Sequence, residues 1–341
     1  MNVYFKNKLL FILWLSFACI ILAPSILYSI EIRPFNSQNL NPLVQIYGLP
    51  YIEDASVLSE GKKSVEFIFD VAQNFVEDST STEQLVFDGE TYRFNIAASF
   101  GVNGSVECGF EIPYVFHDGG ILDNFIEEYH DSFGFPQGGR DNAPRNRLLY
   151  LYTRNGKDRV KVDTSTSGLG DIRLKAALQL YKSEVNGSIN GISLRTCLKL
   201  PTGESDTLHG SGSTDLSFWL SSSHGFKSSI GFIKLFGAAG ILGMTDGKVI
   251  RAQQRNMVGF GGLGIGWCPL EWLLFKMQIN GHTPFFKDSE LKELNSNSAQ
   301  LLMGGTLKIS EHTELDIGVF EDIIVKTSPD VVFQFALRKI F

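Results

Sequence analysis

The sequence predicts an all-β protein, a transmembrane antiparallel up-and-down β-barrel of about twelve strands. Three observations lead to this prediction. Apolar and polar residues alternate with a period of two along many segments. The connections between these segments alternate between short turns and long polar loops. The sequence also finishes on such an alternating segment, "DVVFQFALRKIF", with Phe341 as its last residue.

The composition agrees with this class. The 341 residues are 43% hydrophobic with a mean hydropathy of +0.02, which fits neither a disordered chain nor a helical membrane bundle. The counts of 34 Gly and 27 Phe against 5 Met suit aromatic-rich strands better than packed helices. No stretch after residue 30 reaches 18 uncharged apolar residues. The net charge of −7 and the lack of a basic stripe argue against a nucleic-acid partner.

The N-terminus predicts export. Lys6 and Lys8 precede an uncharged run from Leu9 to Ile30, which is the layout of a signal peptide over residues 1–29. An uncleaved helical anchor is the alternative, because the run is long enough to span a bilayer. Cys19 lies in a poor match to a lipoprotein acylation box. We expect residues 30–63 to be an extended periplasmic lead-in or a partial plug, and residues 64–341 to form the barrel.

The strands follow in order. The first three are "KSVEFIFDVAQNF", "TYRFNIAASF" and "VECGFEIPY", and the Asn103-Gly104 pair between the last two predicts a tight hairpin turn. "DIRLKAALQLY" and "GISLRTCLKL" come next. Weaker candidates occupy residues 214–222, 229–241, 255–267, 271–283, 298–309 and 313–322, before the last strand.

The loops predict the orientation of the barrel. Short turns alternate with longer stretches, of which the segment from Phe116 to Leu169 is the longest. Outer-membrane barrels have short periplasmic turns and long external loops, and an even strand count leaves both termini on the periplasmic side. We therefore expect the segment 116–168 to lie outside the cell. Trp267 and Trp272 flank a short turn, where interfacial aromatic residues belong.

The polar face of the strands carries charge, which is expensive in a dry core but ordinary in a wet lumen. A shift of one residue in any strand would move these charges into lipid. We therefore predict that the following residues line the lumen: Glu66, Asp70, Arg93, Glu107, Glu111, Arg173, Lys175, Arg195 and Lys199. The acidic members cluster on the first and third strands and the basic members on the fourth and fifth. This arrangement gives either a transverse field across a pore or ion pairs that close it.

The last strand resembles the C-terminal signal by which the barrel assembly machinery recognises outer-membrane proteins. The residues that carry the resemblance alternate along the strand and are Phe333, Phe335, Leu337 and Phe341. A broader resemblance rests on "NPLVQIYGLPYIEDA", "VECGFEIPYVF", "GLGDIRLKAALQLY" and "LKLPTGESDTLHGSGSTDL". These segments resemble an uncharacterised family of Gram-negative outer-membrane proteins that is known as a domain of unknown function. The resemblance implies an outer-membrane barrel in contact with lipid, and no activity.

Three features of the sequence could carry chemistry. "EEYHD", from Glu127 to Asp131, combines acids with one histidine, but a solvated loop explains it as well as a metal site does. "GLGD" at 168–171 and "GFGGLGIG" at 259–266 open no helix, so they indicate bends or close backbone approach rather than phosphate binding. Three cysteines would remain after cleavage, with no metal-ligand or disulfide spacing: Cys108, Cys197 and Cys268.

A lipid-acting enzyme is the rival hypothesis, because some outer-membrane barrels use a histidine-activated serine. His209, His224 and His282 are the histidines to weigh, and none stands in a recognisable catalytic motif. We expect no enzyme and no cofactor. The sequence favours a narrow passive channel for small polar or anionic solutes, with a closed structural or binding barrel as the alternative.

Overall fold

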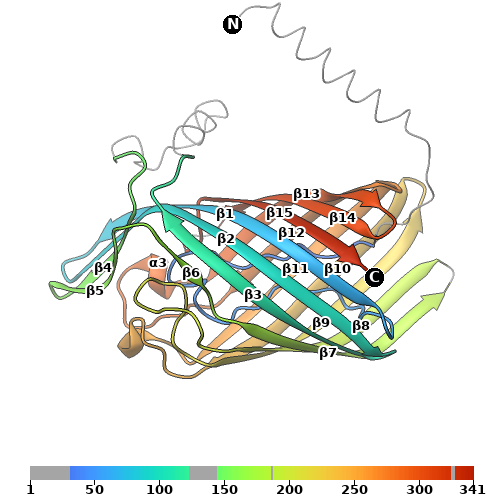
Figure 1. Ribbon diagram of the computed structural model, residues 1–341, viewed down its shortest axis with the longest axis horizontal. Helices are drawn as coiled ribbons and strands as arrows, with labels where there is room; N and C mark the ends of the chain where they lie inside the picture. Colours follow the sequence, from blue (N-terminus) through green and yellow to red (C-terminus); the bar gives the residue numbers. More distant parts are fainter. Residues whose placement is uncertain (1–30, 123–143, 186, 324–326) are drawn as a thin grey trace, which may run out of the picture.

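The protein is described from a computed structural model, which covers residues 31–122, 144–185, 187–323 and 327–341. Within these residues, twelve strands close into one antiparallel barrel (Figure 1). They are β1 (Lys63–Ser79), β2 (Glu83–Asn103), β3 (Val106–Asp118), β7 (Arg173–Val185), β8 (Ser188–Lys199), β9 (Asp215–Ser228), β10 (Gly231–Met244), β11 (Met257–Leu270), β12 (Leu273–His282), β13 (Ser298–Ser310), β14 (Thr313–Asp322) and β15 (Val331–Ile340).

Pairing between the first and last strands closes the ring. β1 and β15 run antiparallel, from Ser64 opposite Ile340 to Gln73 opposite Val331. A closed barrel leaves no unpaired edge, which a bilayer requires because lipid offers no hydrogen-bond partners. The fold class and the number of strands predicted from the sequence are confirmed.

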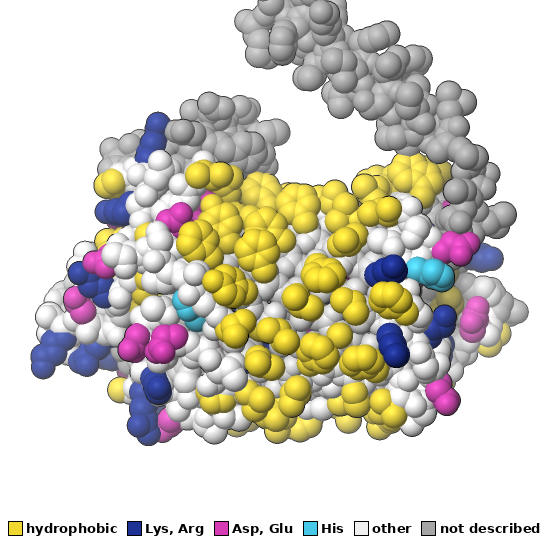
Figure 2. Space-filling model, viewed as in Figure 1, with side chains coloured by type: hydrophobic (Ala, Val, Ile, Leu, Met, Phe, Trp, Pro, Cys, Tyr) yellow, Lys and Arg dark blue, Asp and Glu magenta, His cyan; other side chains and the backbone are white. Residues whose placement is uncertain are grey.

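Large apolar side chains cover the outside of the barrel. Phe67, Phe94 and Leu220 are 55%, 49% and 51% exposed, and Figure 2 shows such side chains gathered over the strands. Such a patch would be unusual on a soluble monomer but is the expected surface of a barrel in lipid. Among the described residues, no helix is long and apolar enough to cross a membrane.

The two ends of the barrel differ, as the sequence predicts. At the short-turn end, tight turns join β2 to β3, β7 to β8, β9 to β10, β11 to β12 and β13 to β14. In the first of them, the Asn103 side chain accepts hydrogen bonds from the backbone N–H groups of Ser105 and Val106, at 2.8 and 2.9 Å. The other end, the long-loop end, carries the longer connections and the extended hairpin of β1 and β2.

The long connection after β3 contains three short strands that were not predicted from the sequence. It holds β4 (Leu149–Arg154), β5 (Lys157–Val162) and β6 (Thr166–Leu169). β4 pairs with residues 83–88 of β2, beyond the ring, and β5 completes a hairpin with it (Figure 1). β6 pairs with β3. Strands of four to six residues give too few alternations to be distinguished from a loop.

Two short helices complete the long-loop end, the 3₁₀ turn η2 (Arg251–Gln253) and α3 (Lys292–Asn295). The Tyr152 hydroxyl on β4 donates a hydrogen bond to Glu83 and lies 3.0 Å from the side-chain oxygen of Gln253. The Glu83 carboxylate also accepts hydrogen bonds from Ser289 and from the backbone of Glu290. These contacts join β2, β4, η2 and the connection between β12 and β13 into one cap over the barrel.

Candidate functional site

The lumen is occupied by residues 31–62, called the inner segment below. It follows a U-shaped path with both ends at the short-turn end (Figure 1). Its first limb begins at Ile32, which packs on Leu274 of β12. Its second limb leaves the barrel where Gly61 and Lys62 hydrogen-bond with Gly101 of β2, and it continues into β1.

The first limb packs against one half of the wall. The Phe35 backbone N–H donates to the Gln278 side chain at 2.9 Å, and the Phe35 ring lies 4.0 Å from the Lys276 ammonium. The Gln334 amide donates to the Asn36 carbonyl at 2.8 Å. Further up, the Asn39 side chain contacts His282 of β12 at 2.9 Å. The limb therefore crosses from the short-turn end to the long-loop end along β12 to β15.

The bend of the U is apolar and lies beneath the cap. The Tyr47 ring stacks on Phe285 with a centroid distance of 5.1 Å and meets Phe286 edge-on at 6.1 Å. The Tyr47 hydroxyl lies 3.5 Å from the carbonyl oxygen of Val249 in the cap. These residues belong to the largest buried apolar cluster, so the bend anchors the segment by hydrophobic contact.

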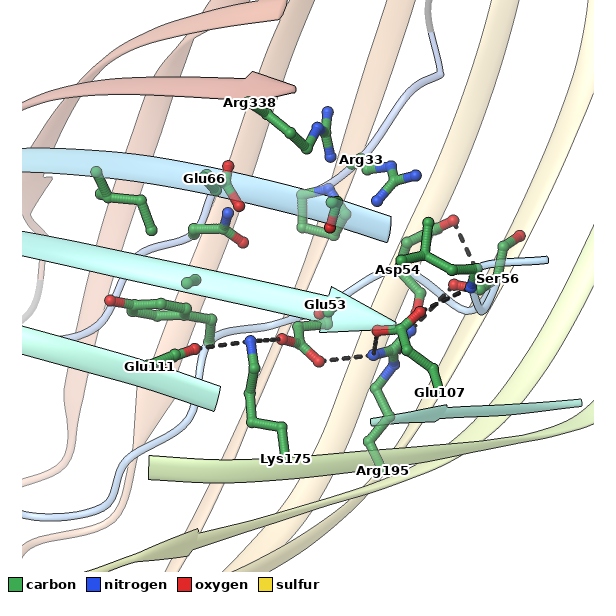
Figure 3. Close-up of a pocket in the computed structure, with 18 residues that line it drawn as sticks. Arg33, Glu53, Asp54, Ser56, Glu66, Glu107, Glu111, Lys175, Arg195 and Arg338 are labelled. Carbon is green, nitrogen blue, oxygen red and sulfur yellow. Dashed lines mark hydrogen bonds and ion pairs between the residues drawn. The ribbon is translucent and has the colours of Figure 1, made fainter. Parts of the chain in front are cut away.

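The second limb carries the two carboxylates that meet the basic wall (Figure 3). Glu53 pairs with Lys175 of β7 and with Arg195 of β8, both at 2.6 Å. Arg195 also donates to the carbonyl oxygens of Asp54 and Ser56, at 2.9 and 3.0 Å. A neighbouring wall residue, Glu111, pairs with Lys175 at 2.7 Å.

Lys234 of β10 joins the two limbs. Its ammonium pairs with the Asp54 carboxylate at 2.7 Å and donates to the Ile32 carbonyl at 3.0 Å. One buried charge therefore binds the start and the middle of the inner segment at once. Buried charges require such compensation, because an unpaired ammonium away from water is very costly.

Lys199 is the centre of a second polar network. It pairs with Asp171 at 2.5 Å and with Asp215 at 3.2 Å. It also donates to the Ser211 hydroxyl at 2.6 Å and to the Ile46 carbonyl at 3.2 Å. Asp215 in turn accepts the backbone N–H of Gly48 at 2.7 Å. This network holds the inner segment just below its bend.

All nine residues expected to line the lumen lie on the inner side of the wall. Six of them bond through their side chains to the inner segment or to each other, namely Glu107, Glu111, Arg173, Lys175, Arg195 and Lys199. Asp70 accepts a bond from Gln334 at 2.7 Å, and Glu107 accepts the backbone N–H of Leu58 at 2.7 Å. Arg173 donates to the carbonyl oxygens of Tyr47 and Leu49. Arg93 is buried opposite Asp70 in the register, and Glu66 faces an internal cavity.

The partners of these residues were not predicted from the sequence. Glu53, Asp54 and Lys234 carry much of the arrangement, yet none was singled out. The sequence does mark Glu53 and Asp54, because they are the only charged residues between Arg33 and Glu60. An isolated acidic pair in an otherwise uncharged segment needs either water or basic partners.

Glycines on the wall give the inner segment room. A Cβ atom at Gly266 would lie 2.2 Å from the Ile32 side chain, and one at Gly262 would lie 3.2 Å from the Ile52 side chain. Both belong to the "GFGGLGIG" stretch on β11. In "GLGD", a Cβ atom at Gly168 would lie 2.8 Å from the His209 ring. The reading of these glycines as sites of close approach agrees with these distances.

The space left inside is small. A cavity of about 60 Å³ lies between the inner segment and the wall, lined by Arg33, Glu66, Arg195 and Arg338 among others (Figure 3). Two smaller cavities, of about 20 and 10 Å³, adjoin His282. These three cavities leave room for a few water molecules beside the inner segment.

The histidines weighed for catalysis bond to groups other than serine. His209 contacts the Thr166 and Thr207 hydroxyls, His224 contacts Asn190, and His282 contacts Asn39 and the Thr283 carbonyl. The part of the chain that the structure covers holds no group of three or more His, Cys, Asp or Glu placed to bind a metal ion. The acidic segment from Glu127 to Asp131 and the predicted signal peptide lie outside the described residues.

The residues of the predicted assembly signal lie on the outer face of β15. Phe335, Leu337 and Phe341 are 45%, 40% and 56% exposed, and Phe333 points to the same side as Phe335. Their recognition by the assembly machinery stays a prediction.

A closed twelve-strand barrel with an apolar exterior and a polar interior defines an outer-membrane β-barrel protein. The chain belongs to a family described as "Protein of unknown function (DUF3187)", whose model matches residues 10–341. This agrees with the resemblance noted in the sequence. A search of curated proteins finds no significant match.

Solved structures share the fold at low sequence identity. The COG4313 outer membrane channel from Pseudomonas putida F1 is 10% identical with a TM-score of 0.52, over 84% of this chain and 98% of that one. CdiB from Acinetobacter baumannii is 10% identical with a TM-score of 0.38, over 82% and 60%. The translocator domain of the autotransporter NalP from Neisseria meningitidis is 8% identical with a TM-score of 0.38, over 84% and 91%.

Proposed function

We propose that the protein is a passive outer-membrane channel for small polar or anionic solutes, closed by its own inner segment. The observation that carries the proposal is the U-shaped path of residues 31–62. The first limb begins at the short-turn end and only the second limb continues into β1. Withdrawal toward the short-turn end therefore requires no threading of the chain through the barrel.

The chemistry of the contacts also supports an opening transition. Both limbs of the inner segment also meet the wall through hydrogen bonds and ion pairs, which water can replace when the lumen fills. A permanent core would be expected to be apolar throughout, because buried ion pairs add little stability relative to apolar packing.

Opening would change the charge of the lumen. Glu53 and Asp54 leave with the inner segment, so Arg195 keeps only Glu107, at 3.8 Å. Lys234 loses the carboxylate of Asp54, its ion-pair partner in the described structure. Lys175 retains Glu111. The exposed wall would carry an excess of positive charge on β8 and β10, and this excess is the basis for a preference for anions.

The test is a reversible restraint on the inner segment. The Cβ atom of Ile32 lies 3.5 Å from an ideal Cβ at Gly266, which is within the range of disulfides. Ile32→Cys with Gly266→Cys, made in a background with Cys108, Cys197 and Cys268 replaced by Ala, should give no openings in planar bilayers when oxidised. The reduced protein should open.

Two results would contradict the proposal. Equal conductance in the oxidised and reduced protein would show that conduction does not require movement of the inner segment. No conductance in the reduced protein, or after deletion of residues 31–46, would favour the closed structural barrel. In the opened channel, Arg195→Gln with Lys234→Gln should shift the reversal potential toward cations, and an unchanged value would remove the anion preference.

A further inference from the structure

A groove with unpaired positive charge lies on the cap at the long-loop end. Two adjacent hollows, of about 510 and 200 Å³, lie between the β4–β5 hairpin and residues 248–253, and residues 205–208 also line the smaller one. Arg159 of β5 and Lys248 line both hollows, so they form one continuous surface, called the basic groove below. Its volume lies in the range of small-molecule sites.

The charges of the basic groove are unbalanced. Five basic side chains line it against two acidic ones, Asp158 and Asp206. Three of the basic residues have nearby carboxylates: Arg154 lies 3.6 Å from Glu83, Lys161 lies 2.9 Å from Asp163, and Arg251 lies 2.9 Å from Asp246.

Arg159 and Lys248 have no ion-pair partner among the residues that the structure covers, although the whole chain has a net charge of −7. Free positive charge is thus concentrated on the two residues that the hollows share.

The backbone beneath these side chains is held in place. The Lys248 N–H donates to the Ser211 carbonyl at 2.8 Å, and the Gly247 N–H donates to the Gln254 side chain at 2.8 Å. Arg159 stands at a β-bulge of β5, between Asp158 and Val160, which pair with Thr153 and Tyr152 of β4. A ligand would therefore order only the side chains, which lowers the entropic cost of binding.

The floor of the basic groove faces the bend of the inner segment. Val249 and Leu208 line the groove, and the Val249 carbonyl lies 3.5 Å from the Tyr47 hydroxyl on the inner side of the cap. The groove therefore lies over the closed lumen rather than beside the lipid-facing wall.

We infer that the basic groove binds a soluble, sugar-sized anion bearing phosphate or carboxylate groups, with Arg159 and Lys248 as its principal contacts. Arginine suits this role because its guanidinium binds phosphate and carboxylate oxygens in a bidentate manner. The position over the bend makes the groove a docking site for the solutes of the channel. The role as a docking site rests on the proposed channel function. Binding of the anion to the groove can be measured without measuring conduction.

The experiment is a calorimetric titration of the folded full-length protein in detergent with glucose 1,6-bisphosphate. Wild-type protein should bind, and Arg159→Gln with Lys248→Gln should weaken binding at least tenfold. Lys157→Gln is the matched control, because Lys157 lies exposed on the same hairpin but lines neither hollow. It should change affinity less than twofold.

Three outcomes would overturn the inference. They are no binding by the wild-type protein, equal binding by the double variant, and an equal loss in the Lys157 control. A further arm uses phosphatidylcholine vesicles with and without lipopolysaccharide. Association that depends on Arg159 and Lys248 only when lipopolysaccharide is present, without binding of the sugar bisphosphate, would assign the groove to a lipid headgroup. Absence of conduction together with groove-dependent binding would contradict the channel proposal alone.

Discussion

Glu53 in the inner segment and Arg195 on β8 form an ion pair with an Oε2 to Nη1 distance of 2.6 Å, although 142 positions separate them in the sequence. The side chains of Glu53 and Arg195 are 15% and 4% exposed. The same Glu53 carboxylate also holds Lys175. This contact therefore joins the inner segment to two strands of the wall at mid-lumen (Figure 3).

Glu53→Gln should destabilise the closed arrangement, because removal of one partner of a buried ion pair costs about 3–5 kcal/mol. We expect more frequent openings in planar bilayers at neutral pH. Glu60→Gln is the control, since Glu60 is an exposed acid on the same segment. Identical open probabilities in both variants and the wild type would contradict a closing role for Glu53.

Gly266→Val should displace the start of the inner segment, because the added Cβ would lie 2.2 Å from Ile32. We expect faster chymotryptic cleavage after Phe35, which is fully buried in the wild type, detected by N-terminal sequencing of the purified protein. Gly259→Val on the same strand adds a Cβ that meets only Thr283, at 3.6 Å, and should leave cleavage unchanged. Ile32→Ala should restore protection in the Gly266→Val background. If it fails to do so, the effect does not arise from this contact.

Lys199→Met should severely destabilise the barrel, because Asp171 and Asp215 would remain buried without their cation. The cost should be about 3–5 kcal/mol, measured by unfolding in urea. Adding Asp171→Asn and Asp215→Asn should recover much of it, since these changes remove the uncompensated charges. Lys182→Met, on the exposed end of β7, is the control. Equal losses of unfolding free energy in the Lys182→Met and Lys199→Met variants would show that the polar network around Lys199 has no special importance for stability.

The cap should loosen in acid through Glu83, which lies where β2 extends beyond the ring. Hydrogen bonds from Tyr152, Glu290 and Ser289 lower the pKa of Glu83 against the opposing effect of burial. A group with a lowered folded pKa stabilises the fold above its unfolded pKa of about 4.3, and this contribution is lost as the pH falls through the folded pKa. The wild-type protein should therefore have a higher melting temperature than the Glu83→Gln variant at pH 7. This difference in melting temperature should vanish in acid. A pH-independent difference would contradict this assignment.

The β4–β5 hairpin should be accessible from outside the cell. Its exposed tip, Lys157 to Arg159, belongs to the long-loop end. Trypsin added to intact cells should cleave there, whereas the turn between β13 and β14, "SEHT" at 310–313, should be protected. The sequence also predicts cleavage near Arg140, Arg145 and Arg147. Of these three residues, Arg140 lies outside the described residues. Cleavage at Lys308 together with protection of the β4–β5 hairpin would show that the barrel has the opposite orientation in the membrane.

The sequence by itself determined the barrel and the two faces of its wall. Alternation is a local property, because successive side chains of a strand point to opposite sides. A shift of one residue would move Arg173 or Lys175 into lipid, at roughly 2–4 kcal/mol for each near the midplane. The inward position of these charges could therefore be predicted without knowledge of their partners. The lengths of the loops and the even number of strands determined which connections lie at the same end of the barrel.

Only the tertiary structure decided what fills the lumen. Residues 31–62 have no period of two or 3.6, so nothing local predicts their path, and their contacts lie on strands far away in the sequence. The choice between a field across an open pore and ion pairs that close it depended on Glu53 and Asp54, which lie outside the strands. Their pairing with Arg195 and Lys234 arises because a closed barrel places distant inward charges around one small volume, where each buried charge requires a partner.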